Sequence, residues 1–171
     1  MPITIQTLRK SATRVRPVEL AKSLSEARAS AQTTAFLCHS HLDQDLARGL
    51  QNFLVEQGWS VYIDWQDTNM PSKPDRNTAA IIQRKIVDCT WFLFLATPNS
   101  VRSRWCPWEI GYADRAKQVE KIVLIRTSDG GRNYGNEYLG LYREITYRSD
   151  GQLAIFPAGQ DTNGMLVENL N

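Results

Sequence analysis

The chain has 171 residues, of which 42% are hydrophobic, and it carries a formal net charge of +2. A chain of this length and composition can bury the core of one domain without disulfides or metal ions. The small net charge gives no reason to expect a nucleic-acid partner, and the longest apolar run, Trp91–Ala96, is too short to cross a membrane. Three cysteines and no signal-peptide pattern predict free thiols and a cytoplasmic location.

Basic residues are concentrated at the start of the chain. Residues 1–31 contain six Lys or Arg side chains and two Glu side chains. Pro17 and the residues up to Arg28 predict a short helix, which would pack on the body of the protein or on a second copy. We therefore divide the chain into a basic, partly helical N-terminal extension (1–31), one domain (32–158) and a C-terminal tail (159–171).

From Thr33 onward, short apolar segments alternate with amphipathic ones. The pattern predicts strands at 34–38, 59–64, 91–97 and 121–126, and helices at 42–57, 78–88 and 105–118. Residues 138–145 read as a short helix or irregular structure, and a last strand is expected near 153–156. The alternation predicts an α/β fold, a flavodoxin-like, doubly wound, five-stranded parallel sheet with the order 2-1-3-4-5.

Two connections stand out as loops. Residues 65–77 are polar, contain Pro71 and Pro74 and show no periodicity, which is typical of a long exposed loop and often of a lid. Residues 99–103 read as a second loop, between a strand and a helix.

Polar side chains follow two of the predicted strands directly. Open parallel sheets bind ligands beyond the carboxyl ends of their strands, where the strand order reverses. That edge receives the side chains that follow the first and third strands, namely His39, Ser40, His41 and Asn99. Trp105 and Glu109 come next, so we expect all of these residues to border a single crevice.

Trp105 and Glu109 are four residues apart and therefore share one face of a helix. An indole suits a flat cationic ring, and a carboxylate suits ribose hydroxyls or positive charge at a sugar carbon. The pair points to a nucleotide or a glycoside as ligand. The alternative is that Trp105 belongs to the core and that Glu109 only complements the helix dipole.

Four short motifs, taken in order, resemble those of Toll/interleukin-1 receptor (TIR) domains. They are Phe36–His39 followed by Asp43, Gly58–Asp64, Ile82–Cys89 and Ser103–Glu109. The resemblance covers about residues 33–126 and implies a flavodoxin-like fold. It also implies that Glu109 is the catalytic glutamate, Trp105 the indole beside it, His39 and Asp43 residues that flank the end of the first strand, and 67–77 a mobile loop.

The Trp-x-x-x-Glu element is similar to that of TIR domains that hydrolyse or cyclise NAD+. Nicotinamide in NAD+ is already a cationic leaving group, so no general acid is needed to expel it. A carboxylate would stabilise the oxocarbenium-like ribosyl centre that remains, and an indole would stack on a ring. Capture by water gives ADP-ribose and capture by a group of the same molecule gives a cyclic product; both stay open.

Other residues carry weaker expectations. Lys73, Arg102 and Arg104 are candidates for holding the pyrophosphate, with ordinary surface charge as the alternative. Cys38 and His41 stand where many relatives have serine. Two histidines without further ligands do not predict a metal site, and there is no Gly-x-Gly-x-x-Gly or phosphate-loop motif. We therefore expect NAD+ as substrate and no metal or cofactor.

Two classes of function follow from this resemblance. One is an NAD-consuming enzyme, which the Trp105/Glu109 pair favours. The other is a non-catalytic adaptor or effector that acts through TIR–TIR contacts, since one fold supports both. Resemblance to bacterial TIR proteins of Thoeris-type antiphage defence implies self-association and a nucleotide signal for a separate effector, with neither nucleic acid nor a membrane as partner.

Overall fold

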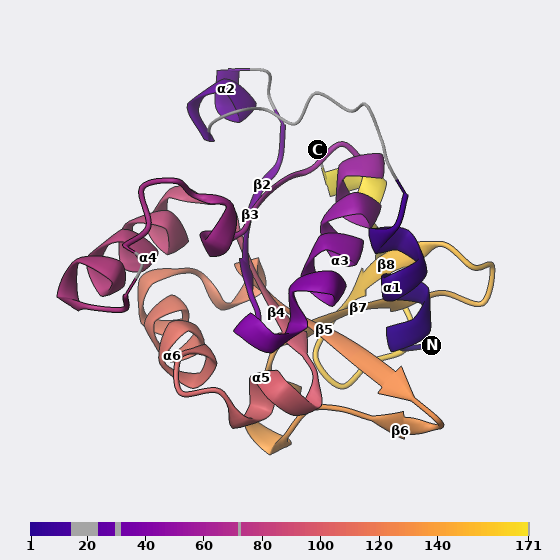
Figure 1. Cartoon of the computed structure of the whole chain (residues 1–171). Coiled ribbons are helices and arrows are strands. Elements are labelled where there is room, and N and C mark those ends of the chain that lie inside the picture. The colour runs from indigo at the N-terminus through magenta and orange to yellow at the C-terminus, as the bar shows by residue number, and fades with distance from the viewer. Residues whose placement is uncertain (15–23, 30–31, 72, 171) are drawn as a thin grey trace.

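The computed structural model describes residues 1–14, 24–29, 32–71 and 73–170 (Figure 1). The strands are β1 (Ile3–Thr4), β2 (Thr34–Cys38), β3 (Ser60–Tyr62), β4 (Trp91–Ala96), β5 (Ile122–Asp129), β6 (Arg132–Asn133), β7 (Arg143–Tyr147), β8 (Leu153–Phe156) and β9 (Met165–Leu166). The α-helices are α1 (Ile5–Ala12), α2 (Leu24–Ala29), α3 (Gln44–Glu56), α4 (Arg76–Asp88), α5 (Pro98–Arg102) and α6 (Cys106–Ala116). Short 3-10 helices are η1 (His41–Asp43), η2 (Asp64–Gln66), η3 (Val119–Lys121), η4 (Glu137–Leu141) and η5 (Val167–Leu170).

The central sheet confirms the predicted strand order. Its parallel part runs β3-β2-β4-β5-β7, and β8 and then β9 continue it in antiparallel fashion. The far end of β5 pairs separately with β1 and β6. The prediction was wrong about the fifth parallel strand, which is β7, whereas 153–156 forms its antiparallel neighbour β8. In β7 only Ile145 is fully buried, so the apolar run that marks a buried strand is missing.

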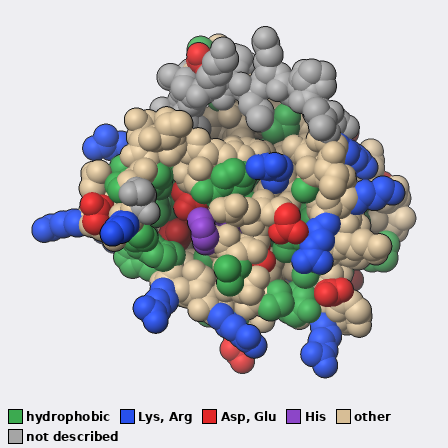
Figure 2. Space-filling model, viewed as in Figure 1, with side chains coloured by type: hydrophobic (Ala, Val, Ile, Leu, Met, Phe, Trp, Pro, Cys, Tyr) green, Lys and Arg blue, Asp and Glu red, His purple; other side chains and the backbone are tan. Residues whose placement is uncertain are grey.

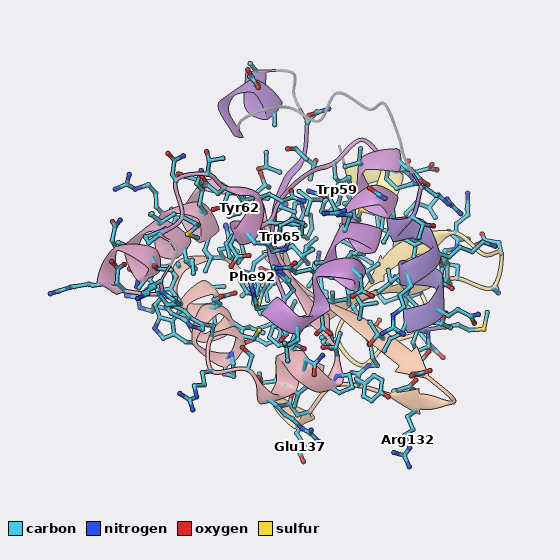
Figure 3. All side chains as sticks on the ribbon, viewed as in Figure 1. Trp59, Tyr62, Trp65, Phe92, Arg132 and Glu137 are labelled. Carbon is cyan, nitrogen blue, oxygen red and sulfur yellow. The ribbon has the colours of Figure 1, made fainter. Side chains whose placement is uncertain are left out.

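Helices cover both faces of the sheet because strand side chains alternate between the faces. Leu37, Leu93 and Val123 face the side covered by α1 and α3, where Leu46, Leu50 and Leu54 complete the cluster. Phe36, Phe94 and Leu124 face α4 and α6 and meet Ile82, Ile86 and Ile110. Figure 3 labels Trp59 and Trp65 of the first cluster and Phe92 and Tyr62 of the second toward the middle of the view, while Arg132 and Glu137 project at the margin.

The described helices are short. The two longest, α3 and α4, have 13 residues each. Among the described residues, no helix combines the length and the apolar character that a membrane crossing requires.

Both ends of the chain contribute to the main core. Ile3 and Leu8 of β1 and α1 are fully buried in the cluster that α3 covers. At the other end, Val167 is buried and its carbonyl accepts a hydrogen bond from Trp59 Nε1 at 3.2 Å. Of the helix expected from Pro17, residues 17–23 lie outside the described residues, and α2 accounts for part of the remainder.

The close approach of α1 to α3 makes Gly49 a sensitive position. A Cβ added to Gly49 would lie 2.0 Å from the backbone carbonyl oxygen of Leu8. We expect Gly49→Ala to lower the free energy of unfolding by about 1–3 kcal/mol in urea denaturation, because α1 must shift. Gly111 of α6 has open space around its Cα, so Gly111→Ala should be neutral or stabilising by up to about 1 kcal/mol. Equal effects of the two substitutions would contradict this packing.

Candidate active site

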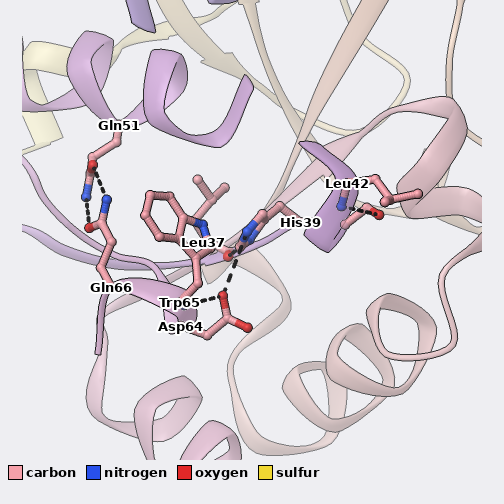
Figure 4. Close-up of polar contacts among 8 residues, drawn as sticks. Leu37, His39, Leu42, Gln51, Asp64, Trp65 and Gln66 are labelled. Atoms are coloured by element: carbon pink, nitrogen blue, oxygen red, sulfur yellow. Dashed lines mark hydrogen bonds and ion pairs between the residues drawn. The ribbon is translucent and has the colours of Figure 1, made fainter. Parts of the chain in front are cut away.

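The carboxyl ends of the parallel strands bring polar side chains together. His39 and Ser40 follow β2, Asp64 follows β3, and Asn99 lies just beyond β4. In Figure 4, His39 and Asp64 face each other from the ends of two neighbouring strands. Polar side chains from separate parts of the sequence therefore follow the carboxyl ends of neighbouring strands, at the edge where the strand order predicts a site.

Glu109 lies in the first turn of α6 and points into the protein. Its helix starts where the Ser103 hydroxyl oxygen accepts hydrogen bonds from the backbone N–H groups of Trp105 and Cys106, at 3.1 and 3.3 Å. The Glu109 residue is only 5% exposed. Among the described residues, no cation forms an ion pair with its carboxyl group. A role limited to complementing the helix dipole at the surface does not fit this burial.

The surroundings of Glu109 favour its neutral form. Burial is the main cause and raises the pKa of Glu109 from its ordinary value of 4.5 to about 8, and the nearby Asp64 carboxylate adds to the rise. The Cys38 thiol, which is fully buried, sits against the same carboxyl group and against Cys106, whose carbonyl oxygen it approaches at 3.9 Å. Burial likewise raises the pKa of Cys38, so this thiol stays neutral, whereas its hydrogen bond with Cys38 lowers the pKa of Cys106. A carboxyl group in such a place responds strongly to any positive charge brought beside it.

One ring nitrogen of His39 contacts a backbone carbonyl oxygen, and the other has no hydrogen-bond partner. Its Nδ1 lies 3.2 Å from the carbonyl oxygen of Leu37. Its Nε2 is buried, makes no hydrogen bond, and lies 3.7 Å from Asp64 Oδ1. The His39 side chain is 3% exposed and that of Asp64 is 37% exposed, so the pair connects the interior to solvent.

Asp43 ties the ends of β2 and β4 together. It is 4% exposed and accepts hydrogen bonds from Thr97 Oγ1 at 2.5 Å and from Asn99 Nδ2 at 2.7 Å. Thr97 also caps α5, which replaces most of the loop expected at 99–103. That expectation was wrong because a capping box between Thr97 and Ser100, with proline at the helix start, closes one helical turn. Asp43 and Asn99 therefore lie together at this edge, with the Asp43 carboxylate engaged by Thr97 and Asn99.

Trp105 lies half-buried at the start of α6. Its ring packs partly on the core that α4 and α6 cover and meets Trp108 edge-on, with ring centroids 5.5 Å apart. Trp108 in turn stacks on Tyr112 at 6.2 Å. Part of the Trp105 ring therefore belongs to the core, as the alternative interpretation expects, and part of it remains at the surface.

The remaining candidates do not converge on Glu109 through direct contacts. The Ser40 hydroxyl accepts a hydrogen bond from the Leu42 backbone N–H and so caps η1. His41, Lys73, Arg102 and Arg104 are exposed. The loop 67–75 is anchored at one end by Asp67, which accepts a hydrogen bond from the Tyr62 hydroxyl at 2.9 Å, and at the other by Asp75, which caps α4.

Sequence reasoning missed Asp64 as a site residue. It ends the predicted strand at 59–64 and lies two residues beyond β3, so the same rule that selected His39 and Asn99, polar residues at strand ends, would have found it. Its partnership with His39 depends on the packing of two strands and left no local signal.

The Glu109 environment is closed in this conformation. Cys38 and Cys106 are fully buried, and Glu109 is nearly so. A cavity of about 910 Å³ opens elsewhere, among β7, β8 and the segment before β9, lined by Glu144, Tyr147 and Phe156 among others. Figure 2 shows a histidine beside acidic and apolar side chains on the viewed face, with Lys and Arg side chains spread around the outline. A ligand would need movement of the surrounding side chains to reach Glu109.

The fold and the site edge define a protein class. A family model described as "TIR domain" matches residues 35–151, and the chain belongs to this family. A curated relative, the "Probable 3' cyclic ADP-D-ribose synthase ThsB'" of Bacillus cereus (strain MSX-D12), is 41% identical over 110 residues. The matched region covers 63% of this chain and 57% of that relative. The chain thus spans little more than half the length of the relative it matches.

Asp43 should contribute strongly to stability. We expect Asp43→Ala to lower the free energy of unfolding by about 2–3 kcal/mol, because Thr97 Oγ1 and Asn99 Nδ2 lose a charged partner in a buried place. Asp45, two residues away, forms an exposed ion pair with Arg9 at 3.0 Å, so Asp45→Ala should cost less than about 1 kcal/mol. Chemical denaturation of both variants measures the contrast, and similar losses would show that the Asp43 contacts contribute little.

The raised pKa of Glu109 predicts a pH dependence of stability. Between pH 4.5 and about 8 the folded chain keeps the Glu109 proton while the unfolded chain releases it. The free energy of unfolding should therefore fall as pH rises through this window. Relative to Glu109→Gln, the unsubstituted chain should lose roughly 2–4 kcal/mol between about pH 5 and pH 8.5. Denaturation curves at both pH values test this, and an identical pH dependence of the two proteins would contradict it.

Proposed function

We propose that this protein cleaves the bond between nicotinamide and ribose in NAD+ and releases nicotinamide with a cyclic ADP-ribose isomer or ADP-ribose. The observation that carries the proposal is the buried Glu109 carboxyl group beside the carboxyl ends of β2 and β3. Membership of the TIR family and the printed name of the Bacillus cereus relative support the substrate. That name also favours the cyclic product.

The environment of Glu109 suits this chemistry because it makes ionisation depend on the substrate. Burial keeps the carboxyl group largely protonated at neutral pH in the closed site, since its pKa is about 8. The pyridinium of bound NAD+ brings a positive charge, which would lower that pKa and leave a carboxylate. As nicotinamide departs with the electron pair of the glycosidic bond, the positive charge moves to the ribosyl centre. A carboxylate held in place with little solvent would stabilise that charge.

Trp105 and the exposed cations take the supporting roles in the proposal. Trp105 offers part of its ring beside the first turn of α6, where it would stack on the pyridinium or adenine. Lys73, Arg102 and Arg104 are exposed near the loop and helix ends that border the edge and would pair with the pyrophosphate. Asp43 and Asn99 would act indirectly, by fixing the ends of β2 and β4.

Self-association belongs to the same proposal. The Glu109 environment is closed, and contacts between copies would offer a way to rearrange Trp105 and the loop 67–75. Activity should then rise more than in proportion to protein concentration. The nucleotide product would serve a separate effector, as in Thoeris-type defence. Cys38, Cys89 and Cys106 form no disulfide with one another, which fits the reducing cytoplasm in which we place the protein.

The direct test is nicotinamide release from NAD+, followed by chromatography with mass detection at low and high protein concentration. We expect Glu109→Gln to lower the rate at least ~100-fold, because it removes the charge that stabilises the ribosyl centre. Glu120 is exposed in η3, and Glu120→Gln should leave the rate unchanged. A folded protein that releases no nicotinamide at any concentration would instead favour the adaptor function.

A further inference from the structure

The imidazole of His39 has a defined acceptor atom. A carbonyl oxygen only accepts hydrogen bonds, so the contact of Nδ1 with the Leu37 carbonyl at 3.2 Å places the ring proton on Nδ1. Nε2 then carries a lone pair. It is buried and has no hydrogen-bond partner.

Burying an acceptor without a hydrogen-bond partner is unfavourable. A ligand that donates a hydroxyl proton to Nε2 would remove this cost. The closest described carboxylate is that of Asp64, 3.7 Å away, which is too far for a hydrogen bond but close enough to stabilise an imidazolium. Asp64 is itself oriented, because its Oδ1 accepts a hydrogen bond from the Trp65 backbone N–H at 2.8 Å.

The pair lies beside the proposed reaction centre. The Asp64 carboxylate is close enough to Glu109 to raise the pKa of that carboxyl group. Glu109 comes from α6, whereas His39 and Asp64 come from the ends of β2 and β3. The site thus carries two groups on separate elements: the Glu109 carboxyl group, which would stabilise the ribosyl cation, and the neutral His39 imidazole, which would act as a base.

We propose that His39 Nε2, assisted by Asp64, accepts the proton of the ribose hydroxyl that closes the cyclic product. The inference rests on the proposed function and concerns its second step. The nicotinamide–ribose bond breaks and its electron pair leaves with neutral nicotinamide. A hydroxyl oxygen of the second ribose in the same molecule forms a bond to the ribosyl carbon, and its proton passes to Nε2. The imidazolium pairs with Asp64, which is partly exposed and lets the proton leave to water. The balance is NAD+ to nicotinamide, cyclic product and one proton.

This division of labour separates bond cleavage from capture. Glu109 governs departure of nicotinamide, while His39 governs which oxygen captures the ribosyl cation. Water needs less help than a ribose hydroxyl that must be held and deprotonated at one atom. Loss of the base should therefore redirect the product to ADP-ribose without stopping cleavage.

The experiment measures nicotinamide, cyclic product and ADP-ribose from the full chain under conditions in which the unsubstituted protein is active. We expect the ratio of cyclic product to ADP-ribose, measured per nicotinamide released, to fall at least ~10-fold in His39→Gln. Asp64→Asn should lower the ratio by a smaller factor. The matched control is Asp45→Asn, an exposed aspartate, which should leave the ratio unchanged.

The outcomes separate the two proposals. If the unsubstituted chain releases no more nicotinamide than Glu109→Gln, the proposed function fails. If nicotinamide is released but the product ratio is the same in His39→Gln, or if only ADP-ribose forms in the unsubstituted protein, the assignment of His39 is overturned while the function stands.

A second measurement does not depend on activity or on the folding of His39→Gln. Nitrogen NMR of the labelled, unsubstituted protein should find the proton of the neutral His39 ring on Nδ1 and none on Nε2. A proton on Nε2 in the neutral ring would overturn the proposal.

Discussion

Complete burial of two central strands shapes everything around the site. All side chains of β2 and β4 are buried, because helices pack on both faces of the sheet. Polar groups are therefore displaced to the strand ends, where the backbone leaves the sheet. At the carboxyl ends this concentrates His39, Asp43, Asp64 and Asn99 in a small volume next to α6. The chemistry available to the protein follows from that crowding of polar groups against an apolar interior.

The same crowding explains why an ionised Glu109 destabilises the fold and yet suits the proposed chemistry. An ionised carboxylate without a cationic partner is unfavourable in a buried place. The fold tolerates Glu109 by keeping it protonated and by bracing its surroundings: Ser103 holds the start of α6, and Asp43 holds the ends of β2 and β4. In the proposed function, the positive charge of the pyridinium would reduce the cost of ionising Glu109.

Much of this arrangement could be predicted from the sequence. Continuous apolar runs located β2 and β4, and leucines at helical spacing located α3, because burial on two faces and on one face leaves clear periodic signals. Strand order then placed His39, Asn99 and Glu109 at one edge. The strand β7 was missed since only Ile145 is fully buried, and α5 was missed since a single capped turn is too short for periodicity. The tautomer of His39 and its pairing with Asp64 depend on distances between strands, which no local pattern encodes.

The margins of the sheet limit how copies of the protein can meet. The two outer strands, β3 and β9, have three and two residues, and such short edges offer few free backbone groups to a neighbour. Joining two sheets at these edges would gain few backbone hydrogen bonds. Helix and loop surfaces would instead associate through side-chain contacts, which come apart more readily than a continuous ladder of backbone hydrogen bonds. Contacts of that kind can form and dissolve with changes in concentration, so the self-association that we propose would be reversible.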